Sequence, residues 1–153
     1  MRYLRIIGAM MLLAVSLLAM TGCQEPASPL EDYTWELVRY GKPGSIGEAL
    51  PDVTVTAYFN SRDKTVSGNG GCNAYSGTYT ASKADLTINT PLIRTEMACG
   101  GAVDQQENEY FKLLQAADRF ELERGMLYIY SGDARLVFQR SDAPPPDIKQ
   151  WGE

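Results

Sequence analysis

The clearest pattern in the chain is an alternation of apolar and polar positions with a period of two residues. In the segment 53–59, the odd positions are apolar and the even positions carry hydroxyl groups. Such a segment is predicted to be a strand with one face on a core and the other toward solvent. Turn-rich tetrapeptides at 61–64 and 131–134 predict two hairpins. Further strands are predicted over residues 34–40, 65–67, 77–80, 85–89, 119–123, 126–130 and 135–139.

A single segment, near residues 103–117, has the period of a helix. Asp104 and Glu107 have the spacing of a capping box at its start. The pattern therefore predicts the α+β fold class, in which one helix packs on a mostly antiparallel β-sheet. The residues on the helical stripe are Val103, Glu107, Tyr110, Phe111, Leu114 and Ala117.

The first 22 residues are organised like an export signal, with Arg2 and Arg5 before an apolar run from 6 to 20. About 15 apolar residues are too few for the roughly 20 of a transmembrane helix, so a retained transmembrane anchor is disfavoured. The following residues, Met-Thr-Gly-Cys at 20–23, resemble the lipobox of bacterial lipoproteins, with Met20 in place of the usual Leu. The resemblance implies cleavage before Cys23 and acylation of its thiol and amine. The alternative is a plain secretory peptide in which Cys23 is incidental.

Acylated Cys23 is predicted to anchor the mature chain in a lipid bilayer, because two or more acyl chains give stable attachment. In the lipoprotein resemblance, Gln24 in place of Asp points to the outer membrane, facing the periplasm. Residues 23–32 are interpreted as the acylated Cys and a tether, since prolines and acids there cannot form a core. The folded domain is expected over 33–141, and a Pro-rich tail with Trp151 over 142–153.

Cysteine counting supports this organisation. Three cysteines in an exported chain leave one thiol unpaired unless Cys23 carries lipid. Cys72 and Cys99 then remain as a pair that is expected to form a disulfide in an oxidising compartment, stabilising the fold by roughly 3.6 kcal/mol. A redox or metal pair is the alternative, although there is no C-x-x-C spacing and no histidine to complete a zinc site. No metal site and no cofactor is predicted.

Composition limits the partners and the chemistry. Loss of Arg2 and Arg5 with the leader moves the formal charge from −5 to −7, so no nucleic-acid partner is expected. The absence of histidine removes Ser-His-Asp and Cys-His arrangements and the commonest general base near neutral pH. Acidic side chains at 107, 109, 121 and 123 are interpreted as solvated. No enzymatic activity is expected, and a carboxylate-dependent hydrolase is the remaining enzymatic alternative.

The middle of the chain is rich in Gly, Asn and Tyr. Its glycines allow positive φ and close backbone approach, its Asn can satisfy a turn, and its tyrosines can cover the core with their hydroxyls in water. A structural role is the favoured interpretation, and the alternative is a ligand loop whose exposed amides bind an anion, although no G-K-[ST] follows. The motif residues are Gly68, Gly70, Gly71, Asn73, Tyr75, Gly77 and Tyr79.

The same segment resembles the META domain family, which includes bacterial heat-shock lipoproteins of the HslJ type. The resemblance covers roughly residues 33–140 and depends on Trp-Glu-Leu at 35–37, Val-Ser-Gly-Asn-Gly-Gly-Cys-Asn-Ala-Tyr-Ser-Gly-Thr-Tyr at 66–79 and Thr-Glu-Met-Ala-Cys at 95–99. It implies a compact, barrel-like β-rich fold with one packed helix, an envelope location, and links to heat stress and antibiotic tolerance. It supplies no catalytic residues, and the Pro-rich tail departs from the HslJ pattern.

The function expected from these observations is that of a membrane-anchored, non-catalytic binding or stress-tolerance module. Its partner would be an envelope protein or a cell-wall ligand, held at an exposed sheet face or edge. Tyr40, Tyr58, Tyr128 and Tyr130 could supply that surface, although packing on the core or along a strand face is the favoured interpretation of these residues. The alternative function is a periplasmic inhibitor of a hydrolase such as lysozyme, steered by the acidic charge of the chain.

Overall fold

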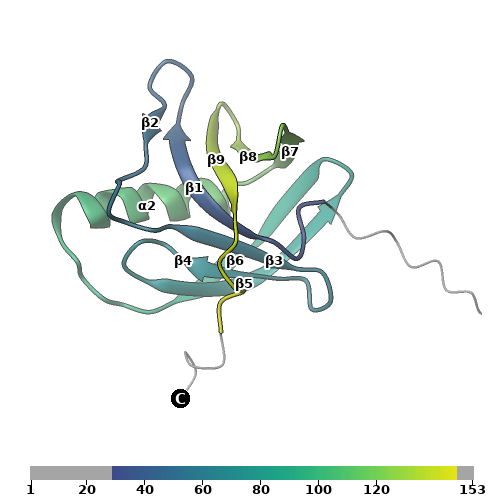
Figure 1. The fold of residues 1–153 in the computed structure, drawn as a ribbon, viewed down its shortest axis with the longest axis horizontal. Coiled ribbons are helices and arrows are strands. Elements are labelled where there is room, and N and C mark those ends of the chain that lie inside the picture. Colours follow the sequence, from purple (N-terminus) through teal and green to yellow (C-terminus); the bar gives the residue numbers. More distant parts are fainter. Residues whose placement is uncertain (1–28, 148–153) are drawn as a thin grey trace, which may run out of the picture.

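The computed structural model of the chain describes residues 29–147. Within them, nine strands form one antiparallel sheet, and the helix α2 (Gly101–Gln115) follows the sixth strand (Figure 1). The predicted α+β class, with one helix on an antiparallel sheet, is confirmed. The strands are β1 (Thr34–Gly41), β2 (Gly47–Glu48), β3 (Thr56–Asn60), β4 (Thr65–Asn69), β5 (Ala74–Ser82), β6 (Asp85–Arg94), β7 (Arg119–Glu123), β8 (Met126–Ser131) and β9 (Ala134–Ser141).

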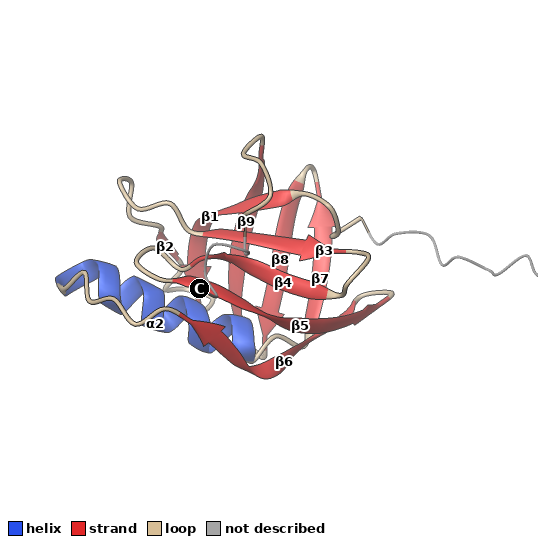
Figure 2. Ribbon diagram, turned by 90° about the horizontal axis from the view of Figure 1, so that it is seen from below, coloured by secondary structure: helices blue, strands red, loops and turns tan. Residues whose placement is uncertain are grey.

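The sheet closes on itself because β1 pairs with both β3 and β9. Neighbours from β3 to β9 follow the order of the sequence, and the short β2 adds to β1 alone. The join between β6 and β7 is narrow: Asp85 and Arg119 are its only register pair among the described residues. Next to this join, α2 packs against β6, β8 and β9 (Figure 2). The strands thus form a ring whose weakest seam is flanked by the helix.

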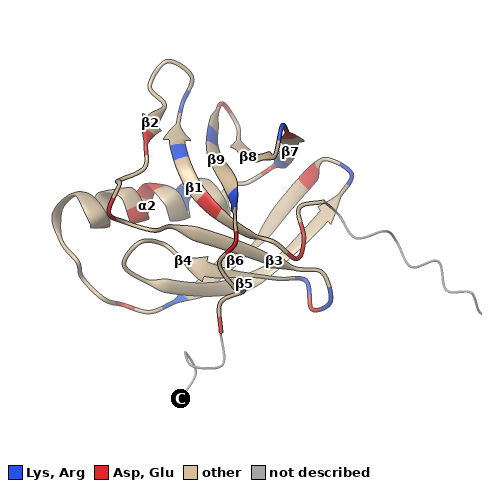
Figure 3. Ribbon diagram, in the orientation of Figure 1, with Lys and Arg blue, Asp and Glu red and all other residues tan. Residues whose placement is uncertain are grey.

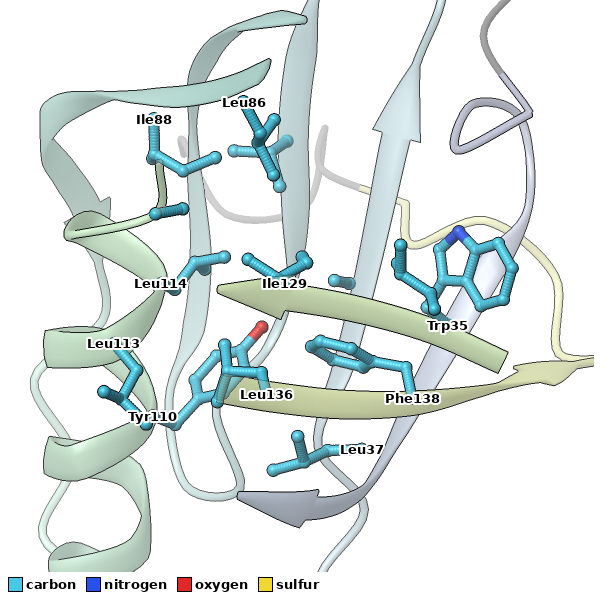
Figure 4. Packing of buried hydrophobic residues seen from close by; sticks show 14 of the residues in the cluster. Trp35, Leu37, Leu86, Ile88, Tyr110, Leu113, Leu114, Ile129, Leu136 and Phe138 are labelled. Carbon is cyan, nitrogen blue, oxygen red and sulfur yellow. The ribbon is translucent and has the colours of Figure 1, made fainter. Parts of the chain in front are cut away.

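Alternation explains which face of each strand is buried. In β3, Ala57 and Phe59 point into the core, and in β8 Leu127 and Ile129 do the same. The core lies inside the ring, where side chains from α2 meet those from the strands (Figure 4). Both predicted hairpins are present, since β3 pairs with β4 across the turn 61–64 and β8 pairs with β9 across the turn 131–134. The local pattern was therefore sufficient to place these strands.

Some boundaries differ from the sequence-based predictions. The strand predicted from Val53 begins at Thr56, because Val53 closes a turn through a hydrogen bond from its amide to the Leu50 carbonyl. The strands predicted at 77–80 and 85–89 extend over 74–82 and 85–94. The longer strands include one glycine, Gly77, and one proline, Pro91, which local propensity treats as strand breakers.

The predicted capping box is wrong. The helix begins at Gly101, its N-cap is Gly100, and no side chain caps it. Asp104 lies inside the first turn, and its Oδ1 accepts a hydrogen bond from the Cys99 amide at 3.0 Å. Glu107 turns into the protein instead of reaching back along the helix. Glycine has no side chain, so the N-cap residue provides no side-chain acceptor to the first amides of the helix.

The ordered packing begins before Tyr33. Leu30 and Glu31, which composition assigns to the tether, are both buried. Trp35 donates from its indole nitrogen to the Leu30 carbonyl at 2.9 Å, and the Asp32 amide donates to the Phe59 carbonyl at 2.8 Å. The packed part of the chain therefore includes at least three residues that the composition placed in the tether.

The remaining predictions about the chain ends fall outside residues 29–147. The predicted leader, Cys23 and Trp151 all lie in the parts that the structure does not describe. Over the described range, no helix has the length and apolar character needed to span a membrane.

Candidate functional site

The glycine-rich loop between β4 and β5 lies against α2. Its turn is closed by a hydrogen bond from the Gly70 amide to the Asn73 carbonyl at 2.7 Å. A Cβ at Gly70 would lie 2.7 Å from both Glu107 Oε1 and Phe111 Cζ, so a larger residue there would displace these side chains. Gly71 has φ of 116°, a conformation that side chains disfavour. These two glycines let the loop backbone reach the helix.

The loop binds the carboxylate of Glu107. Glu107 Oε1 accepts hydrogen bonds from the amides of Cys72 at 3.0 Å and Asn73 at 2.6 Å, and its Oε2 accepts one from Asn73 Nδ2 at 2.6 Å. Only 4% of Glu107 is exposed, so its interpretation as a solvated residue is wrong. A buried carboxylate is tolerated when donors replace its water. The loop amides do bind an anion, and that anion belongs to the chain itself.

Asn73 joins this loop to the segment that connects β6 to α2. Its Oδ1 accepts hydrogen bonds from Thr95 Oγ1 at 2.9 Å and the Met97 amide at 2.7 Å, while its Nδ2 donates to the Met97 carbonyl at 3.1 Å. The neighbouring Cys72 forms a disulfide with Cys99, with an S–S distance of 2.04 Å. The predicted pairing of these two cysteines is confirmed. The connection is therefore held to the loop by covalent and polar bonds together.

A groove runs between α2 and residues 91–98, and we call it the α2 groove. It contains two adjoining hollows of about 280 and 380 Å³, both lined by Arg94 and Asn108. The Arg94 guanidinium lies over the Phe111 ring, 5.1 Å from its centroid. On the segment that forms one wall, the side chains of Ile93 and Met97 are 78% and 58% exposed. Large apolar side chains left in water beside a groove indicate a surface for binding.

One family model matches most of this chain. The META domain model matches residues 28–143, most of the chain. The chain belongs to the META domain family. No curated protein matches this chain significantly.

Two solved structures share the fold of this META domain. An NMR structure of a protein from Burkholderia xenovorans is 25% identical, with a TM-score of 0.64 and coverage of 80% of this chain and 94% of that one. A crystal structure of a DUF4847 family protein from Bacteroides vulgatus is 16% identical, with a TM-score of 0.54 and coverage of 76% and 97%. These two similarities support the fold of this chain.

A second buried polar cluster in the META domain involves the residues before β1. Glu31 Oε1 accepts a hydrogen bond from the Tyr79 hydroxyl and an ion pair from Lys64 Nζ at 2.6 Å. Burial, and then the hydrogen bond to the Glu31 carboxylate, raise the pKa of Tyr79 well above its ordinary value. The prediction that the Tyr79 hydroxyl lies in water is therefore wrong. The sequence offered no local signal for this cluster, because Glu31 follows a proline-rich segment.

Tyr75 of the motif also has a buried hydroxyl. It lies 2.6 Å from the Tyr110 hydroxyl on α2, and the two hydroxyl oxygens lie 3.0 and 3.3 Å from the Thr56 carbonyl oxygen, which accepts from them. Burial raises the pKa of both tyrosines. A Cβ at Gly68 would lie 2.0 Å from the same carbonyl oxygen, so Gly68 leaves room for it. At Gly77 a Cβ would lie 2.4 Å from Leu92 Cδ2. The motif is thus built for close packing.

The tyrosines proposed as a binding surface are only partly exposed. Arg119 lies over the Tyr130 ring, 3.5 Å from its centroid, and Arg135 lies 5.8 Å from that of Tyr128. Tyr40 packs against the core, and Tyr58 is half-buried on β3. Packing along strand faces therefore accounts for these residues better than a free aromatic surface.

Proposed function

We propose that this protein is a lipid-anchored lipoprotein of the cell envelope, whose META domain is a non-catalytic binding module that holds its partner in the α2 groove. The single observation that carries the anchor is the disulfide between Cys72 and Cys99. The chain has three cysteines, so the disulfide leaves Cys23 as the residue available for lipid, directly after an export signal. Gln24 in the next position favours the outer membrane, facing the periplasm.

The binding role is supported by how the buried acids are used. Glu107 is surrounded by three donors, and Glu31 by a lysine and a tyrosine. A carboxylate held in this way contributes to stability and is poorly placed to act as a general acid or base on a substrate. The α2 groove, in contrast, leaves the large apolar side chain of Met97 in solvent. The proposal includes a role in stress tolerance through a bound envelope partner, as the resemblance to the HslJ type implies.

The anchor is tested by changing Cys23→Ala. We expect the variant to lose palmitate labelling and to accumulate as unprocessed or soluble protein, because the acceptor thiol is gone. Ser28→Ala is the control, since it keeps the Met-Thr-Gly-Cys segment and should be labelled like the natural chain. Mass spectrometry of the natural protein should show an acylated Cys23 at the mature N-terminus. Labelling that persists in Cys23→Ala contradicts the anchor.

The binding role is tested with a photo-crosslinking amino acid placed in living cells at residue 96 in the α2 groove. The matched position is residue 123, which is exposed on β7. We expect a discrete crosslinked partner from position 96 and none from position 123. A partner from position 123 alone would keep the binding role and move it to another face. No adduct from either position would contradict a binding module.

A further inference from the structure

The wall of the α2 groove behaves like the edge of a sheet beyond the end of β6. The Thr95 amide donates to the Ala74 carbonyl of β5 at 3.0 Å, and the Met97 amide donates to Asn73 Oδ1 at 2.7 Å. In an extended chain, alternate amides point to opposite sides. By this alternation the amides of Glu96 and Ala98 point away from β5. Neither donates to an acceptor in the part of the chain that the structure describes.

This edge is held in place before any partner arrives. The disulfide at Cys99 and the hydrogen bonds of Asn73 bind it to the glycine-rich loop. The Cys99 amide is held by Asp104 of α2. A pre-organised edge loses little conformational entropy on binding, which favours association. Unpaired main-chain donors at alternate residues are complementary to the carbonyls of another extended chain.

We propose that residues 94–98 bind an extended polypeptide segment of a partner, which adds a strand along this edge in the α2 groove; this inference rests on the proposed binding function. Met97, which lines the groove and is 58% exposed, offers an apolar contact to a side chain of that segment. Glu96 and Asp104 line one hollow, and Arg94 stacks on Phe111.

The charges along the groove indicate the composition of the segment. Acidic positions lie on α2 and on the connection that leads to it (Figure 3). The carboxylates of Glu96 and Asp104 favour a lysine or arginine on the peptide by charge complementarity. The partner is therefore an extended segment with alternating apolar residues and at least one basic residue.

The test begins with a phage library of random octapeptides, selected on the purified full chain. We expect enriched peptides to alternate apolar residues and to carry a basic residue. In hydrogen–deuterium exchange, the bound peptide should slow exchange over residues 94–98. Two copies of the best peptide are then N-methylated, one at odd and one at even positions. One of the two methylated peptides should bind about tenfold more weakly, because its methyl groups replace the amide hydrogens that face the edge. Binding of the other peptide should change about twofold or less.

Two variants of the protein separate the main chain from the side chain. Glu96→Pro removes the outward amide and should weaken binding about tenfold, whereas Glu96→Ala keeps it and should weaken binding about twofold. Thermal unfolding of both variants monitors the fold, and the peptide arms remain decisive if Glu96→Pro is unstable. Failure to enrich any peptide, equal effects of the two methylation patterns, or protection outside 94–98 would overturn the inference. A crosslinked partner at residue 123 would then leave the binding function standing without this site.

Discussion

At the scale of single residues, Glu107 shows how a contact between distant segments changes the role of a side chain. The helical pattern places it on the same stripe as Tyr110 and Leu114, which signals a buried position. Its negative charge, in contrast, favoured the interpretation that Glu107 is exposed to solvent. The amides that donate hydrogen bonds to its carboxylate belong to Cys72 and Asn73, which are 35 and 34 residues away in the sequence. No local pattern could therefore have identified them. An acid on an apolar stripe was the one signal that could have found it.

Glu107→Gln should lower the free energy of unfolding by about 2 kcal/mol, because hydrogen bonds to a charged group are stronger than those to a neutral amide. The new amide also brings an NH₂ group toward the Asn73 amide. A loss of this size corresponds to a fall in Tm of roughly 8 °C.

The control for this change is Glu109→Gln on the same helix. Glu109 is partly exposed and pairs with Lys112, so its loss should change stability by about 0.5 kcal/mol or less. Thermal and urea unfolding measure both variants. Equal stability of the two variants would show that the loop does not depend on the Glu107 charge.

At the scale of elements, α2 is joined to the sheet through buried tyrosines. Tyr110 of α2 meets Tyr75 of β5, and both hydroxyls share the Thr56 carbonyl at the start of β3. The aromatic rings were predictable as core because they follow the helical and strand periods. The shared carbonyl was not, since it requires three elements to meet at one point.

The buried tyrosines predict a loss of stability in alkaline solution. Their pKa values are raised in the folded state by burial, whereas unfolded tyrosines titrate near pH 10. Above about pH 10 the unfolded chain releases protons that the folded chain retains. The stabilisation is therefore complete below that pH and is lost as the pH rises, by up to about 1.4 kcal/mol per pH unit for each buried tyrosine.

Urea unfolding between pH 8 and pH 11.5 checks this dependence. Tyr75→Phe should make the alkaline loss less steep, because one titrating group is removed. The matched change Tyr130→Phe, on the outer face, should leave the slope close to that of the natural chain. A slope that Tyr75→Phe does not alter would contradict the role of burial.

At the scale of the whole molecule, stability depends on pairings between distant parts of the chain. β1 pairs with β9 at the opposite end of the sequence, and the disulfide joins residues 27 positions apart, linking the β4–β5 loop to the β6–α2 connection. The cysteine pair was predictable by counting. The closure of the sheet was implied only by the family resemblance, because alternation says which face of a strand is buried but not which strand lies beside it.

The double change Cys72→Ser and Cys99→Ser should reduce the free energy of unfolding by roughly 3.6 kcal/mol, the loop-closure value for this separation. Urea unfolding under non-reducing conditions measures the loss, and a reductant should have no further effect on the variant. The natural mature chain should show no free thiol when denatured without reductant. Two titratable thiols in that experiment would rule out the bridge in solution.

The sequence by itself determined the type of nearly every element and the partner of each cysteine in the folded domain. These features depend on neighbours in the chain, on composition or on counting. The tertiary structure alone decided which strands pair to close the sheet, that Glu31 and Glu107 are buried, and that the amides of Glu96 and Ala98 have no acceptor in the described part of the chain. Each of these depends on donors and acceptors brought together from distant segments, and their free energy exists only once the ring of strands has formed.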